Sequence, residues 1–163
     1  MIISDYSSID YTKYKRLFVF GCSFTNYAWP TWADVLKTQM PDAEYYNIAT
    51  SGAGNQYITH KLTETNYVTP FTDTDLIVIM YSTYCREDRY LVNHWETPGN
   101  IFTCSFYPEE FTKKYSCTRG YLLRDIGLMD LANSYLQTLP SDSIQLLSVP
   151  WYYQTFEFDK IGR

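Results

Sequence analysis

One aliphatic run constrains the fold of this chain more than any other segment. Leu76 to Met80 are five consecutive aliphatic residues that follow the acidic Asp75. A run without polar alternation is typical of a strand that is covered on both faces, as in a parallel sheet. Residues 17–20, which end at Gly21, show the same pattern. The sequence therefore predicts a parallel sheet with helices on both faces.

The rest of the chain alternates between strand and helix patterns. We expect further strands at residues 44–48 and 144–149, and helices at 31–40, from about residue 55 onward, and at 122–139. Residues 84–115 break the pattern, and there we expect a long excursion with one short helix after Pro108. This order predicts a single α/β domain over residues 1–163, with ligands bound at the loops that follow the strands.

Composition and charge exclude several kinds of partner. The net charge is −5 and no long Lys/Arg cluster occurs, so we expect no nucleic-acid partner. No export signal or apolar run of membrane length is visible, which favours a cytoplasmic protein without a membrane partner. The two separated histidines predict no metal site, and we expect no cofactor. The 17 tyrosines favour a contact surface, for a homo-oligomer or a larger assembly such as a virion.

The loop after the first expected strand holds the best candidate for a nucleophile. It reads Gly21-Cys22-Ser23-Phe24-Thr25, so a serine hydroxyl lies at the carboxyl edge of the sheet. A sharp turn can present such a hydroxyl, and nearby backbone N–H groups can stabilise an oxyanion. The alternative is a serine that caps the next helix or bonds within its own turn.

Two further loops follow strands in the same way, and together the three segments resemble a known family. Residues 47–55 follow the second strand, and Gly52 within them can offer an unobstructed N–H. The third segment is Met80-Tyr81-Ser82-Thr83. With residues 20–25, these segments are similar to the first three sequence blocks of the SGNH (GDSL-type) hydrolases.

The resemblance implies a flavodoxin-like three-layer α/β/α sandwich that hydrolyses a small ester or an acylated glycan. It implies that Ser23 is the nucleophile, and that the N–H groups of Ser23 and Gly52 hold the oxyanion. Thr83, or alternatively Ser82, would be the third donor.

Two residues near these loops are candidates for substrate contacts. Arg86, in a charged stretch after the third block, could clamp a polar substrate, or it belongs to a solvated loop. Asn55 either contacts a ligand or caps and orients the helix that begins there.

The sequence departs from the family pattern at three places. Cys22 replaces an aspartate, Thr83 replaces an asparagine, and no histidine follows Val149, where the family has an Asp-x-x-His pair. Without a base, a serine hydroxyl is a poor nucleophile. The base would then be His94, another chain, or sequence missing from a C-terminally incomplete domain, whereas His60 is expected at the surface.

Two functional hypotheses remain open from the sequence. The first is a serine ester hydrolase that is weak or inactive as this chain. The second is a non-catalytic binding or structural subunit that keeps the SGNH fold. Related scaffolds support many activities, so the fold alone does not choose between the two.

Overall fold

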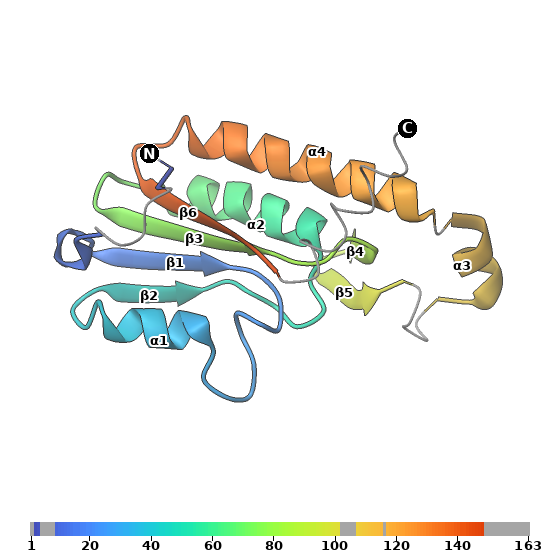
Figure 1. Cartoon of the computed structure of the whole chain (residues 1–163), viewed down its shortest axis with the longest axis horizontal. Helices are drawn as coiled ribbons and strands as arrows, with labels where there is room; N and C mark the ends of the chain where they lie inside the picture. Colours follow the sequence, from blue (N-terminus) through green and yellow to red (C-terminus); the bar gives the residue numbers. More distant parts are fainter. Residues whose placement is uncertain (1, 4–8, 102–106, 116, 149–163) are drawn as a thin grey trace.

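A four-stranded parallel sheet forms the centre of the protein (Figure 1). The computed structural model describes residues 2–3, 9–101, 107–115 and 117–148. The sheet has the order β2-β1-β3-β6, and every neighbouring pair is parallel. Its strands are β1 (Arg16–Phe20), β2 (Glu44–Asn47), β3 (Asp75–Tyr81) and β6 (Asp142–Leu147). The predicted α/β class with a mainly parallel sheet is therefore confirmed, and the two apolar runs form its central strands.

Helices pack on both faces of this sheet. Because side chains alternate along a strand, Leu17 packs on one side with Ala33 of α1 (Trp32–Thr38). Its neighbour Phe18 packs on the other side with Ile58 of α2 (Asn55–Val68) and Leu136 of α4 (Thr118–Leu136). Both faces of β1 and β3 are thus buried, which explains why these strands show no polar alternation.

Local signals fix the ends of the predicted helices. At the start of α1 the Asp34 carboxylate accepts hydrogen bonds from the N–H and hydroxyl of Thr31, at 2.7 and 3.0 Å. Proline follows shortly after α1 and α4, at positions 41 and 140, where a helix cannot continue. The 3-10 turn η1 (Tyr11–Lys13) precedes β1.

The segment between β3 and α4 contains a β-hairpin that the sequence did not predict. Strands β4 (Arg86–Tyr90) and β5 (Trp95–Asn100) pair antiparallel, with an irregularity between Glu87 and Arg89. The short helix expected after Pro108 is confirmed as α3 (Glu109–Tyr115). The last strand begins two residues before its expected start and reaches Leu147, and Val149 lies outside the described residues.

Candidate functional site

Ser23 lies in a tight turn directly after β1. The N–H groups of Thr25 and Asn26 both donate to the carbonyl of Cys22, at 2.8 and 3.1 Å, and this closes the turn. The Ser23 side chain is half-buried, whereas Cys22 is fully buried. Within the described ranges, Ser23 makes no side-chain hydrogen bond, so no base is paired with its hydroxyl there.

The loops after β1 and β2 meet at one edge of the sheet. The N–H of Thr50 donates to the carbonyl of Gly21 at 3.3 Å, and the side-chain amide of Asn26 donates to the carbonyl of Ala49 at 2.9 Å. These bonds join the segment that contains Ser23 to the segment that contains Gly52, as the parallel strand order predicts.

Gly52 faces the hairpin at very close range. Its φ is +79°, and a Cβ added to it would lie 2.0 Å from the carbonyl oxygen of Thr97 in β5. Beside it, the Thr97 hydroxyl donates to the carbonyl of Ser51 at 2.9 Å. The Gly52 N–H makes no hydrogen bond to any residue that the structure describes, so it remains free to act as a donor.

Asn55 links the second and third loops from the first turn of α2. Its Oδ1 accepts from the N–H of Ser82 at 2.9 Å, and its Nδ2 donates to the carbonyl of Ser82 at 3.0 Å and to Asp125 at 3.3 Å. All three residues are fully buried. The side chains of Asn55 and Ser82 therefore have no exposed surface through which to contact a substrate, and Asn55 orients the helix start instead.

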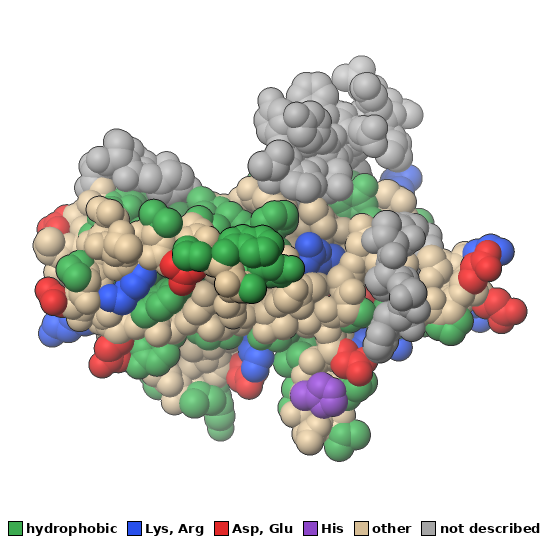
Figure 2. All heavy atoms as spheres, turned by 90° about the horizontal axis from the view of Figure 1, so that it is seen from below, with side chains coloured by type: hydrophobic (Ala, Val, Ile, Leu, Met, Phe, Trp, Pro, Cys, Tyr) green, Lys and Arg blue, Asp and Glu red, His purple; other side chains and the backbone are tan. Residues whose placement is uncertain are grey.

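The other predicted site residues lie directly after β3, on the hairpin and on α2. Thr83 is half-buried after β3. The Arg86 guanidinium donates to the carbonyl of Ala53 at 2.9 Å, so it fastens the second loop to β4. His60 on α2 and His94 at the tip of the hairpin are both exposed, and Figure 2 shows a histidine at the protein surface. The Nδ1 of His94 lies 2.9 Å from the side-chain oxygen of Asn93.

A buried carboxylate that the sequence did not indicate caps α2. Asp88 of β4 accepts hydrogen bonds from the N–H groups of Gly54 and Tyr57, each at 2.8 Å. Burial raises the pKa of Asp88 to about 6, although these two bonds and the charge of Arg124 favour the ionised form. No local pattern marks Asp88, because its partners lie more than 30 residues earlier in the chain.

A second buried carboxylate was detectable in the sequence. Asp125 lies three residues after Leu122, on the apolar face of the predicted helix at 122–139. Burial raises its pKa, and the Nε of Arg124 donates to it at 2.7 Å. A carboxylate on a core-facing stripe requires polar partners, and Asn55 and Arg124 provide them here.

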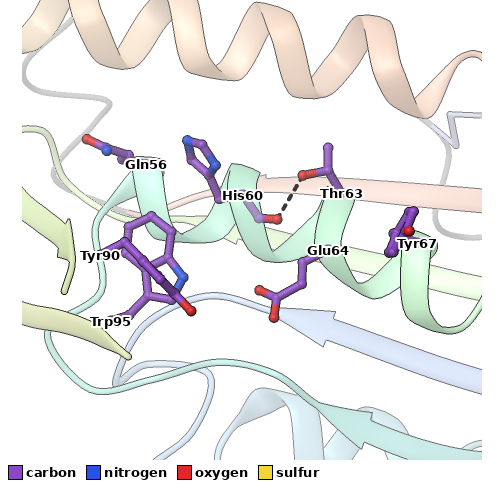
Figure 3. A pocket seen from close by; sticks show the side chains of 7 residues that line it. All are labelled: Gln56, His60, Thr63, Glu64, Tyr67, Tyr90 and Trp95. Carbon is purple, nitrogen blue, oxygen red and sulfur yellow. Dashed lines mark hydrogen bonds between the residues drawn. The ribbon is translucent and has the colours of Figure 1, made fainter. Parts of the chain in front are cut away.

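Cavities open at several places on the described surface. One of about 620 Å³ lies between α2 and the β4–β5 hairpin, and Figure 3 shows its lining. A cavity of about 310 Å³ is lined by residues of α2 and α4. Another, of about 320 Å³, is lined by Glu87, Cys117, Tyr121 and Arg124 among others. Neither Ser23 nor Gly52 lines any of the three.

No protein-family model, curated protein or solved structure matches this chain. Among the described helices, none is both long and apolar enough to cross a membrane. Over the same part of the chain, no group of three or more His, Cys, Asp or Glu side chains is arranged to hold a metal ion.

Proposed function

We propose that the chain is a weak serine ester hydrolase of SGNH type, acting on a small ester or an acylated glycan at the sheet edge beside Ser23. The supporting observation is the hydrogen bond from Thr50 N to Gly21 O, which joins the Ser23 turn to the Gly52 loop. The order β2-β1-β3-β6 is also that of the first four strands of a flavodoxin-like sandwich. In such sheets a ligand binds where the strand order reverses, here between β1 and β3.

The chemistry would proceed through an acyl-enzyme. Ser23 Oγ adds to the ester carbonyl carbon as its proton leaves to solvent or a base, and the tetrahedral oxyanion accepts a hydrogen bond from the Gly52 N–H. The half-buried Thr83 hydroxyl is the candidate for a further donor. Collapse of the intermediate expels the alcohol, and water then releases the acid from Ser23.

The missing base sets the expected rate. General acid–base catalysis contributes on the order of 10²- to 10⁴-fold, and Ser23 has no hydrogen-bonded base in the described part of the chain. We therefore expect slow turnover, with the oxyanion donors and substrate positioning supplying most of the acceleration.

The test compares Ser23→Ala with a matched serine variant of the adjoining loop. We expect slow hydrolysis of p-nitrophenyl acetate by the full chain, loss of this activity in Ser23→Ala, and its retention in Ser51→Ala, because the Ser51 side chain is exposed. A fluorophosphonate probe should modify the peptide that contains Ser23. Equal rates in the wild type and Ser23→Ala, with no modification of Ser23, would reject the hydrolase proposal.

A non-catalytic binding role is the second candidate, and one observation favours it. Ser23 lines none of the three cavities described above. If Ser23 proves inert in the assay above while the protein retains a ligand at one of these cavities, the binding role is the better description.

A further inference from the structure

The cavity between α2 and the β4–β5 hairpin is a groove between two elements that are distant in sequence. One wall is the exposed side of α2, and the other is formed by Tyr90 and Trp95 of the hairpin (Figure 3). At about 620 Å³ it falls within the range of small-molecule sites.

Trp95 is a rigid aromatic anchor in this groove. Its ring is held by Tyr57 at 5.7 Å, His60 at 5.4 Å and Tyr90 at 5.4 Å between centroids, and the two tyrosines meet it edge to face. Trp95 also packs against the main core cluster and is half-buried. An indole fixed in this way loses little conformational entropy when a ligand stacks on it. Tyr90 is 60% exposed and extends the aromatic surface.

The facing wall carries polar groups at regular spacing. Gln56, His60 and Glu64 are four residues apart along α2, so they lie on one side of the helix, about one turn from each other. All three line the groove, with an amide, an imidazole and a carboxylate (Figure 3). The Oε2 of Glu64 pairs with Lys61 at 2.9 Å, and its Oε1 has no hydrogen-bond partner among the described residues.

This combination selects for a particular ligand chemistry. The aromatic faces of Trp95 and Tyr90 favour a ligand with apolar surfaces. The row of polar side chains on α2 favours a ligand that both donates and accepts hydrogen bonds. A sugar hydroxyl does both. No Lys or Arg lines the groove and the chain carries a net charge of −5, so an anionic ligand would lack a counter-charge.

A proline-rich peptide is the main competing ligand for an aromatic groove. Its prolines have no N–H, so such a segment offers mainly carbonyl acceptors. The carboxylate of Glu64 accepts hydrogen bonds and cannot donate them when ionised, so it would find few partners on that peptide. Sugar hydroxyls would satisfy it.

We propose that the groove between α2 and the hairpin binds a neutral carbohydrate, through stacking on Trp95 and Tyr90 and hydrogen bonds to Gln56, His60 and Glu64. The site is distinct from the Ser23 turn, and the proposal does not depend on ester hydrolysis. It assigns the hairpin a recognition role.

The test is binding of the full chain to an array of neutral and acidic oligosaccharides, followed by calorimetric titration of the strongest neutral ligand. We expect Tyr90→Ala and Trp95→Ala to weaken the affinity about tenfold or more, as for aromatic hot-spot residues of an interface, and Glu64→Gln to weaken it several-fold. Trp29→Ala, which removes an exposed indole elsewhere, and Ser23→Ala should both retain the wild-type affinity.

Tyr90→Ala and Glu64→Gln keep the test valid if Trp95→Ala does not fold, because both side chains are exposed. Three results would overturn the proposal: no neutral glycan on the array binds, the bound glycan is unaffected by Tyr90→Ala and Glu64→Gln, or a decaproline peptide binds the groove and the glycans do not. Equal hydrolysis rates for the wild type and Ser23→Ala, together with intact glycan binding, would reject the hydrolase proposal and leave the glycan-binding proposal standing by itself.

Discussion

Gly52 and Gly127 differ in how much space their surroundings leave for a side chain. Gly52 has a left-handed backbone and lies against the carbonyl of Thr97, whereas an added Cβ at Gly127 on α4 meets no atom within 4 Å. The first position can accept no side chain without moving the hairpin. The second is an ordinary, exposed helix position.

This contrast predicts opposite effects of the same substitution. Gly52→Ala should lower the free energy of unfolding by about 2 kcal/mol or more, because a left-handed non-glycine residue alone costs about 1–2 kcal/mol and the new Cβ would collide with Thr97. Gly127→Ala should raise it by about 0.5–1 kcal/mol, since alanine is the better helix former. Urea unfolding of both variants measures the difference, and a stable Gly52→Ala protein would contradict the close contact.

Among individual residues, the sequence predicted which backbone segments lie together better than it predicted side-chain contacts. It predicted that the Ser23 turn and the Gly52 loop meet, because the carboxyl ends of parallel strands share one edge of a sheet. It did not predict that Asn55 and Ser82 bury their polar groups against each other. That pairing depends on how α2 docks on the end of β3, which no local pattern encodes.

The hairpin is the element that most shapes the candidate sites. Arg86 and Asp88 bind the start of α2 from β4, and Thr97 binds the second loop from β5. Pro98, Gly99 and several charged residues give its strands weak β-propensity. Long-range contacts rather than propensity form it, and for this reason the sequence indicated only an excursion.

The junction between hairpin and helix should respond to pH through Asp88. Its pKa of about 6 lies above the ordinary value of 3.8, so the folded state favours the protonated carboxyl. The stabilisation from protonation is therefore complete below about pH 4 and is lost as pH rises through about 6, an effect of about 3 kcal/mol. Urea unfolding between pH 4 and 7.5 should show this decline in the wild type relative to Asp88→Asn, which cannot ionise.

Far-ultraviolet circular dichroism at pH 4 provides the folding control for this variant. Identical spectra of the wild type and Asp88→Asn would show that the asparagine does not change the fold. Parallel stability profiles for the two proteins across the pH range would contradict the role given to the Asp88 carboxyl.

In the whole molecule, the central strands β1 and β3 belong to the hydrophobic clusters on both faces of the sheet. β1 and β3 contribute alternate residues to a cluster with α1 and to a cluster with α2 and α4. Because the two clusters share β1 and β3, unfolding of these strands on one face of the sheet would also expose the apolar residues on the other face. The sequence predicted this arrangement because uninterrupted apolar strands require cover on both faces.

Shared strands predict a single cooperative unfolding transition. Trp32 on α1 and Trp95 on the hairpin report on opposite sides of the sheet. In variants that keep only one of these tryptophans, with the others replaced by Phe, fluorescence and circular dichroism should give the same urea midpoint. Separate midpoints for Trp32 and Trp95 would show that the hairpin side unfolds on its own.

The tip of the hairpin differs from its base in how much it is constrained. Residues 91–94 are all exposed, while the base is fixed by the contacts of Arg86, Asp88 and Thr97. Exchanging or lengthening the tip would therefore remodel one end of the groove at little thermodynamic cost. The hairpin base is thus held in place while its tip is free to vary in sequence. Residues 91–94 are therefore the positions at which to begin changing which ligand the groove would select.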